Sequence, residues 1–402
     1  MKAPSHTTRN CPCCGAHTTT ALMNNQMATI GGLDMSYTIG SCQQCGFLYA
    51  NELPNETCYS HYYRTLSKYD QITSASQVSA VDRIRADATV ALCAPHLDST
   101  SAIADLGCGV GHLLHAFKVA GWHELYGLDP APSAPQQALS LFDLTNVQSG
   151  TLSDATKLLP VDRIKLYCLT GVLEHLWSPR EELLALFRQL KPGTLILIEV
   201  PALECFSRQP NEPFGEFSLE HIQYFSQQSL CRMFAQLGAE TIHTSLLDLD
   251  NAATDSLLGL FRISGKCADT AWSSSSNADS EMNALTLYIT QSARAQENII
   301  SRLAHAPRPW VIYGAGSHTA RLLPILTSKG LDKHIAAVID GNTNLHGQKI
   351  GHWIISPPSE LTHHPKTTVI ISSFRAQVAI GTALAEHFPN PLLYLYPNNS
   401  HS

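Results

Sequence analysis

Two cysteine pairs near the start of the chain constrain its fold more than any other feature. Cys11 and Cys14 lie in the run Cys-Pro-Cys-Cys, and Cys42 and Cys45 flank two glutamines. Tetrahedral Zn²⁺ is often held by four thiolates, and a CxxC turn presents two of them from one tight loop. The four cysteines therefore predict a structural zinc site. A closed set of four protein ligands leaves no open position for a substrate, so we do not expect a catalytic zinc ion.

The first cysteine pair can be chosen in two ways. Cys13 could replace Cys14 as the second ligand, but Cys14 gives both pairs the same CxxC spacing and is the preferred choice. Gly31 and Gly32 lie midway between the pairs and predict a hairpin turn. A module of this size has too small a core to fold alone, so the metal would supply much of its folding free energy.

Composition narrows the class of protein. With 402 residues, of which 44% are hydrophobic and 15% charged, the chain is long enough for two or three domains. Its net charge of −7 argues against a nucleic-acid partner, which usually leaves a basic footprint. The first residues are polar, the apolar runs are too short to cross a membrane, and the other cysteines are scattered singly. We therefore expect a cytoplasmic protein that has reduced thiols, no membrane partner and a small-molecule substrate, with its oligomeric state open.

From about residue 81 onward, apolar runs alternate with helical segments. The expected strands are residues 102–106, 125–128, 164–169 and 195–200, and the expected helices are residues 81–93, 179–190 and 227–237. Two late runs, residues 240–247 and 257–263, are expected to form a closing antiparallel pair. Strands that alternate with helices indicate a parallel sheet covered on both faces.

A second α/β unit follows a serine-rich joint. Its expected elements are a helix at residues 281–305, strands at 310–313, 335–339 and 368–372, and a helix at 376–387. The predicted organisation is a zinc-binding module (1–60), a central domain (61–269), a linker (270–280) and a C-terminal α/β domain (281–402). The fold class is α/β, with two Rossmann-like units beside the small module.

A glycine-rich loop follows the first expected strand of the central domain. Gly107, Gly109 and Gly111 alternate with other residues, directly after Asp105. Such a loop places backbone amides and a helix N-terminus at the carboxyl edge of a parallel sheet. The spacing resembles the first motif of class I methyltransferases, whose loop cradles the methionyl part of S-adenosylmethionine. Asp129 closes the next strand, where a carboxylate can accept hydrogen bonds from ribose hydroxyls.

Further segments resemble the same family in the same order. Asp154 fits the position that usually faces the adenine amine, and Glu174-His175 and Lys-Pro-Gly193 are similar to later strand motifs. Alone, the glycine loop could be a plain nucleotide-binding or structural turn, but the ordered motifs favour a methyltransferase with S-adenosylmethionine as its cofactor. Glu174 and His175 are interpreted as structural or cofactor-side residues.

Residues 217–226 carry the candidate acid–base chemistry. This segment contains Glu220, His221 and Tyr224, and it follows a loop after the strand at 195–200. Loops at that edge lie over the methyl donor. Methyl transfer requires the protein to align the acceptor and, where needed, to remove its proton. Histidine titrates near neutrality and suits that role.

The whole layout resembles the nucleotide-sugar C-methyltransferases of deoxysugar biosynthesis. A cysteine zinc module, a class I core, the Glu-His-x-x-Tyr-Phe-Ser segment and a C-terminal α/β domain come in the same order. The resemblance implies that His221, with Glu220 beside it, removes a proton from the carbon next to a 4-keto group. It also implies substrate contacts from tyrosines, for which Tyr62, Tyr63 and Tyr224 are the candidates.

The chain departs from this family at several positions, and other functions stay open. Leu219 stands where the family usually has a second histidine. One alternative is O- or N-methylation of another carbohydrate or polar metabolite. A second is an NAD-linked oxidoreductase that uses the loop Gly314-Ala-Gly316 with Asp340. A third is a protein that binds S-adenosylmethionine without turnover.

Overall fold

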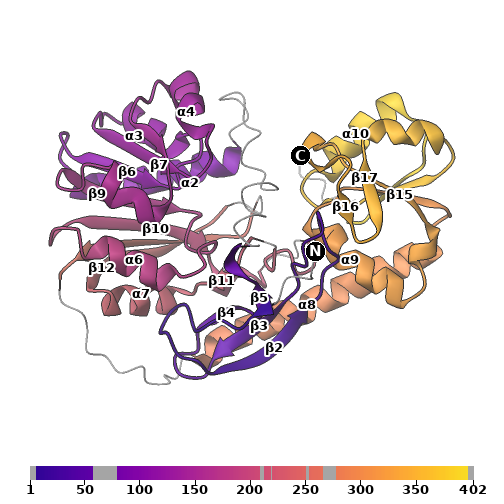
Figure 1. The fold of residues 1–402 in the computed structure, drawn as a ribbon, viewed down its shortest axis with the longest axis horizontal. Coiled ribbons are helices and arrows are strands. Elements are labelled where there is room, and N and C mark those ends of the chain that lie inside the picture. The colour runs from indigo at the N-terminus through magenta and orange to yellow at the C-terminus, as the bar shows by residue number, and fades with distance from the viewer. Residues whose placement is uncertain are drawn as a thin grey trace.

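The structure, a computed structural model, describes residues 6–57, 79–208, 212–218, 220–249, 253–265 and 278–396. It contains a central domain, a C-terminal domain and a small N-terminal module (Figure 1). The hairpin of the N-terminal module and the long first helix of the C-terminal domain run side by side from the central to the C-terminal domain. None of the described helices is both long and apolar enough to cross a membrane.

The central domain is built on a seven-stranded sheet. Its strands are β6 (Ala102–Leu106), β7 (Leu125–Asp129), β8 (Val147–Ser149), β9 (Ile164–Thr170), β10 (Leu195–Pro201), β12 (Ala239–Leu247) and β13 (Ser256–Ile263). Its helices are α2 (Ala80–Cys93), α3 (His112–Val119), α4 (Ala134–Phe142), α5 (Ala155–Leu158), α6 (Pro179–Phe187) and α7 (Gln227–Gln236). The strand order is β12-β13-β10-β9-β6-β7-β8, and every neighbouring pair is parallel except those that involve β13.

The central strands of this sheet, such as β6 and β10, are almost wholly buried, so the sheet is covered on both faces there. Ile196 and Ile198 of β10 pack into one hydrophobic cluster, whereas Leu195 and Leu197 pack into another on the opposite face. Alternation across a pleated strand produces this division, and burial of both faces is characteristic of parallel sheets. The predicted α/β fold with an antiparallel closing pair is confirmed.

The N-terminal module is a four-stranded antiparallel sheet. Its strands are β2 (Thr19–Asn25), β3 (Tyr37–Cys42), β4 (Leu48–Asn51) and β11 (Gln223–Tyr224), and the order is β11-β4-β3-β2. Two further short strands, β1 (His6–Thr7) and β5 (Leu53–Pro54), pair beside it. The module therefore includes one strand whose residues come from the sequence of the central domain.

The hairpin turn predicted at Gly31 and Gly32 is present. Ile30 and Leu33 exchange both backbone hydrogen bonds at 3.0 Å, and the glycines have φ of 58° and 83°. Positive φ at both central positions is the geometry of a tight two-residue hairpin, which glycine adopts without strain. The tip reaches the C-terminal domain, where Ile30 forms an isolated bridge with Ile350.

The C-terminal domain is a second α/β unit. Its elements are α8 (Ala278–His305), β14 (Trp310–Tyr313), α9 (Ser317–Ser328), β15 (Ile335–Ile339), β16 (Lys349–Ile350), β17 (Trp353–Ser356), β18 (Thr368–Ile371), α10 (Gln377–His387) and β19 (Leu392–Tyr394). The strand order is β16-β17-β15-β14-β18-β19, and all pairs but β16–β17 are parallel. Helix α8 begins at Ala278, three residues before the predicted start at residue 281.

Candidate active site and metal centre

The predicted glycine loop lies between β6 and α3 at the carboxyl edge of the central sheet. Gly107, Gly109 and Gly111 have φ of 87°, 51° and 87°, a region that L-residues with side chains rarely adopt. A Cβ added at Gly107 would lie 2.5 Å from Val172, and one added at Gly111 would lie 2.6 Å from Leu144. A Cβ at Gly109 would meet no described atom within 4 Å, so this glycine faces open space.

Asp129 ties the loop to the next strand. Its Oδ2 accepts a hydrogen bond from the Gly109 amide at 2.8 Å, and its Oδ1 accepts one from the Ala131 amide at 2.9 Å. Asp105 lies beside it and is 1% exposed. Burial, and then the charge of Asp129, raise the pKa of Asp105 to about 8. Two buried carboxyl groups thus lie close together beside the glycine loop.

Asp154, the predicted adenine-side residue, ends a short 3₁₀ helix (Leu152–Asp154) after β8. Its Oδ2 accepts hydrogen bonds from the backbone amide and hydroxyl of Thr151, at 3.0 and 2.8 Å. These bonds lower the pKa of the Asp154 carboxyl. The carboxylate therefore caps its own turn, next to the strand that follows Asp129 in the sheet.

The segment that carries His221 is held on both sides by backbone hydrogen bonds. The Ile222 amide donates to the Glu174 carbonyl at 2.8 Å, and the Ile222 carbonyl accepts from the Ala50 amide at 3.0 Å. On its N-terminal side, the His221 amide donates to Ser218 Oγ at 3.0 Å. The histidine is thus fixed between the loop after β9 and strand β4 of the module.

His221 lies against two other titratable residues, Glu174 and His175. One ligand atom from each of the three lies within 4.8 Å of the other two. The rings of His175 and His221 meet edge to face, with centroids 4.9 Å apart. Burial lowers the pKa of both histidines, and burial together with Glu199 raises that of Glu174 to about 8. All three residues stand out in the sequence, but no sequence signal predicts that they meet.

The other acceptor-side candidates have different surroundings. The Glu220 carbonyl accepts a hydrogen bond from His175 Nδ1 at 3.0 Å, and the Glu220 amide donates to Ser218 Oγ at 3.2 Å. Tyr224 is 1% exposed, and its hydroxyl donates to the Tyr37 hydroxyl at 3.4 Å. Burial raises the pKa of Tyr224 well above its usual value. Tyr62 and Tyr63 lie outside the described residues.

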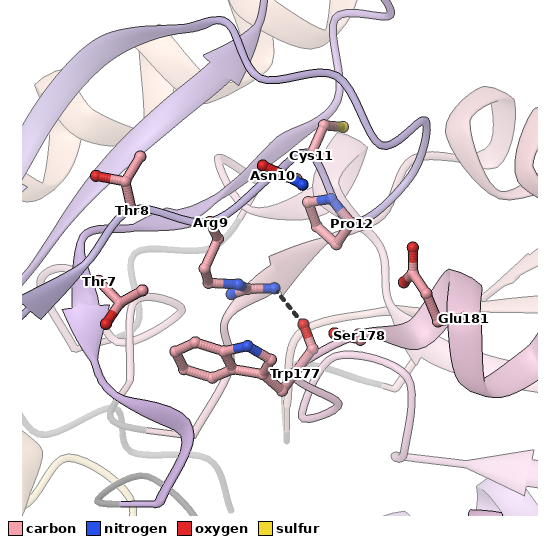
Figure 2. Close-up of a pocket in the computed structure, with 9 residues that line it drawn as sticks. All are labelled: Thr7, Thr8, Arg9, Asn10, Cys11, Pro12, Trp177, Ser178 and Glu181. Atoms are coloured by element: carbon pink, nitrogen blue, oxygen red, sulfur yellow. Dashed lines mark hydrogen bonds between the residues drawn. The ribbon is translucent and has the colours of Figure 1, made fainter.

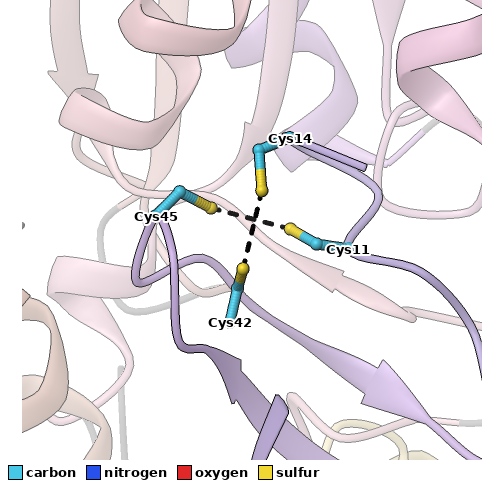
Figure 3. Close-up of side chains that lie close together, drawn as sticks. All are labelled: Cys11, Cys14, Cys42 and Cys45. Carbon is cyan, nitrogen blue, oxygen red and sulfur yellow. Dashed lines mark hydrogen bonds between the residues drawn. The ribbon is translucent and has the colours of Figure 1, made fainter. Parts of the chain in front are cut away.

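The four predicted cysteines converge at one end of the module (Figure 3). The Sγ atoms of Cys11 and Cys45 are 3.6 Å apart, and those of Cys14 and Cys42 are 3.5 Å apart. Sulfurs bound tetrahedrally at about 2.3 Å from zinc lie roughly 3.8 Å from one another. The set of thiols therefore fits a tetrahedral thiolate site.

The two CxxC turns have the same backbone geometry. Gly15 donates its amide to the Cys11 carbonyl at 2.8 Å, and Gly46 donates to the Cys42 carbonyl at 2.9 Å. Both glycines have positive φ, 79° and 76°. Matching turns place the two pairs of thiols face to face, and Cys14 is the residue of the first pair that belongs to the converging set.

A pocket of about 330 Å³ lies where the module meets the loop after β9 (Figure 2). Arg9, which is 5% exposed, crosses it and donates to the carbonyls of Trp177 at 2.7 Å and Ala50 at 3.2 Å. Its guanidinium also lies over the Trp177 ring, 4.9 Å from the centroid. Arg9 therefore joins the first cysteine turn to the loop that carries Glu174, a contact for which the sequence holds no local signal.

The C-terminal glycine loop repeats the geometry of the first. Asp340 Oδ2 accepts from the Ala315 amide at 2.7 Å, and its Oδ1 accepts from the Asn342 amide at 2.7 Å. Gly314 has φ of 103°, and a Cβ there would lie 2.9 Å from the Ser372 carbonyl oxygen. Both domains thus use a carboxylate at the end of the second strand to hold the loop after the first.

Residues 81–244 match a family described as a methyltransferase domain. The matched range contains the glycine loop, Asp129, Glu174, His175 and His221. No curated protein matches the chain.

Solved methyltransferases are among the similar structures. The 1,6-didemethyltoxoflavin-N1-methyltransferase of Burkholderia thailandensis is 15% identical, with a TM-score of 0.41 over 57% of this chain and 96% of that one. The N-methyltransferase NodS of Bradyrhizobium japonicum is 16% identical, with a TM-score of 0.38 over 51% and 97%. The magnesium protoporphyrin IX methyltransferase of Synechocystis is 15% identical, with a TM-score of 0.38 over 52% and 100%.

Proposed function

Because this chain is an S-adenosylmethionine-dependent methyltransferase with its methyltransferase domain at residues 81–244, we propose that it methylates a carbon atom of a nucleotide-linked keto-deoxysugar. The observation that carries this proposal is the environment of the His221 ring, which combines partial burial, a lack of hydrogen bonds from the ring to the described residues and a lowered pKa. Its ring is half-buried and makes no hydrogen bond to any described residue, while the backbone around it is held by the bonds of Ile222 and by the bond from the His221 amide to Ser218 Oγ. Burial, then His175, lower its pKa well below the usual value, so the ring is a neutral base.

The cofactor site is assigned to the carboxyl edge of β6 and β7. The open space beside Gly109 supports close approach of a ligand. Asp129, which holds the glycine loop, is assigned to the ribose hydroxyls. Asp105 is assigned to the cationic methionyl group, which would favour the ionised form of its carboxyl. Asp154, which lies beyond β8, is assigned to the adenine amine. When bound, S-adenosylmethionine supplies an electrophilic methyl group on a sulfonium.

His221 removes the proton that makes the acceptor carbon nucleophilic. A 4-keto group acidifies the neighbouring C–H bond, and a ring nitrogen of His221 takes that proton. The electron pair of the C–H bond then forms the new bond to the methyl carbon, and the sulfonium leaves as a neutral thioether. Glu220 is assigned to hold the substrate or the histidine ring in place, as the family resemblance implies.

Structural zinc at Cys11, Cys14, Cys42 and Cys45 is part of the proposal. The sulfur–sulfur distances and the matched turns support it. Its contribution to the reaction is positional, because β4 of the module pairs with β11, directly after His221. Zinc thereby stabilises the sheet that holds the base.

The nucleotide part of the acceptor is assigned to the C-terminal domain, and Tyr62, Tyr63 and Tyr224 to substrate contacts. The loop of Gly314 and Asp340 has the backbone geometry of a nucleotide-binding turn. The same geometry keeps NAD binding as a second candidate for this domain. Fluorescence titration with NADH and with dTDP separates the two, because only the ligand that the domain accepts will bind.

The decisive experiment is incubation with trideuteromethyl-labelled S-adenosylmethionine and a dTDP-4-keto-6-deoxyhexose, followed by mass spectrometry. Three deuteria on a ring carbon of the sugar would establish C-methylation. A label on an oxygen or nitrogen atom would show that the chain is an O- or N-methyltransferase. No transfer by protein that binds the cofactor would overturn the proposed acceptor and leave the methyltransferase domain standing.

A further inference from the structure

Glu174, His175 and His221 form a cluster of metal-ligating side chains outside the cysteine site. Their ligand atoms lie within 4.8 Å of one another. Ligands at about 2.0–2.2 Å from one ion lie at most roughly 4.4 Å apart. A shift of less than about 1 Å would therefore bring all three onto a single ion.

Hydrogen bonding sets the direction of the His175 lone pair. A carbonyl oxygen only accepts, so the bond of 3.0 Å between His175 Nδ1 and the Glu220 carbonyl places the ring proton on Nδ1. Nε2 then carries the lone pair and lies 3.8 Å from Glu174 Oε1. A backbone carbonyl that fixes the far nitrogen of the ring is the usual support for a histidine that ligates a metal.

The Glu174 carboxylate gives a second, independent observation. The residue is 3% exposed, and its Oε2 is buried with no hydrogen-bond partner among the described residues. Its Oε1 faces the lone pair of His175 Nε2. A buried carboxylate oxygen without a donor is costly, and a cation between these atoms would remove that cost.

We infer that Glu174, His175 and His221 form a second metal site, which binds a divalent transition ion reversibly. Two imidazoles and one carboxylate suit Co²⁺, Ni²⁺, Zn²⁺ and Fe²⁺ rather than Mg²⁺ or Ca²⁺. His221 is only half-buried, so the ion can enter from the acceptor side. The bound ion takes the ring nitrogen that the proposed mechanism needs for the proton, and it therefore inhibits methyl transfer.

The test uses the full chain with zinc at its cysteines, titrated with Co²⁺ in equilibrium dialysis without any acceptor. We expect one cobalt per chain in addition to the zinc, without the intense thiolate-to-cobalt absorption that replacement at the cysteines would produce. Glu174→Gln and His175→Gln should each weaken cobalt binding on the order of 100-fold. The matched controls Glu181→Gln and His363→Gln change exposed residues and should bind cobalt like the wild type.

Zinc content and S-adenosylmethionine binding show whether each variant is folded. His221→Gln, at the half-buried end of the cluster, serves if a fully buried variant does not fold, and it should weaken binding to a similar degree. The inference is overturned if the wild type takes up no cobalt beyond the cysteine site, or if His221→Gln binds it as tightly as the wild type. Because no sugar is present, failure of the proposed acceptor does not affect this result.

Discussion

At the scale of single residues, the neighbouring carboxyl groups of Asp129 and Asp105 differ in the hydrogen bonds that they accept. Asp129 accepts two backbone N–H bonds, whereas Asp105 Oδ1 is buried and accepts none from the described residues. A carboxylate that accepts N–H donors is stabilised as an anion, and a buried one without them is stabilised as an acid. Asp129 therefore holds the glycine loop through backbone donors, whereas burial, and then the charge of Asp129, raise the pKa of Asp105 to about 8.

Asp105→Asn should change how stability depends on pH. The unfolded carboxyl titrates near 3.9 and the folded one at about 8, so between these values the folded state holds a proton that the unfolded state has lost. The wild type therefore loses stability as pH rises from about 4 to 8, and Asn removes that loss. In urea unfolding, Asp105→Asn relative to the wild type should be about 1–3 kcal/mol more stable at pH 8 than at pH 5. Asp87→Asn, on the exposed face of α2, is the control, and an equal difference at both pH values contradicts the assignment.

His221→Asn should separate catalysis from cofactor binding. Asn keeps a polar side chain of similar reach but cannot accept the proton, so methyl transfer should fall by about 10²–10⁴-fold. Affinity for S-adenosylmethionine should stay within about 3-fold, because His221 is assigned to the acceptor side. The measurements are initial rates and calorimetric titration, with His123→Asn, an exposed residue before β7, as the control. Unchanged turnover would remove His221 from the mechanism.

At the scale of elements, strands that form an apolar run in the sequence could be predicted. Strands too short to show such a run could not. The bounds of strands β6 and β10 can be predicted to within one residue because these strands are apolar runs buried on both faces. The two cysteine turns can be predicted because the CxxC spacing is typical of a turn that presents two metal ligands. Strand β11 has two residues and no periodicity, and its partner β4 lies far earlier in the chain. The meeting of Glu174, His175 and His221 depends on that pairing, so the three residues can be recognised in the sequence but their contact cannot.

The double substitution Cys42→Ser with Cys45→Ser tests the connection between metal and base. It should release zinc and reduce amide protection across β3, β4 and β11 by at least about 10-fold, because the sheet loses its closing ligands. Hydrogen exchange and metal analysis are the measurements, and β6 and β7 should keep their protection. Cys13→Ser, a buried thiol outside the converging set, should keep zinc and the exchange pattern. A double variant that stays protected and fully active contradicts a structural zinc site.

At the scale of the whole molecule, one buried arginine joins three parts of the chain. Arg321 of α9 is 4% exposed and donates to the carbonyls of Phe217 at 2.8 Å and Pro213 at 3.1 Å, and to Asn25 Oδ1 at 3.3 Å. Glu212 Oε1 lies 3.5 Å from its Nη1. The C-terminal domain is thereby fixed to the module and to the loop before His221.

Arg321→Met should destabilise the whole assembly by about 2–4 kcal/mol, because two buried carbonyls lose their charged donor. Urea unfolding should show this lower free energy of unfolding, and the C-terminal domain should unfold less cooperatively with the rest of the chain. Arg163→Met, which removes an exposed ion pair with Glu124, should cost less than about 1 kcal/mol. If the two substitutions lower the free energy of unfolding equally, Arg321 does not connect the C-terminal domain to the module and to the loop before His221.

The shared strand β11 also limits how this enzyme can be divided or recombined. A fragment of residues 81–244 would retain Ile222 and Tyr224 but lose Ile39, Leu48 and the other module side chains that cover them. It would present a bare apolar edge, the kind of surface that drives aggregation. Replacement of the N-terminal module would also replace β4, the strand that pairs with β11. Recipients in a domain-swapping experiment therefore need the module and the segment at 217–226 from the same parent.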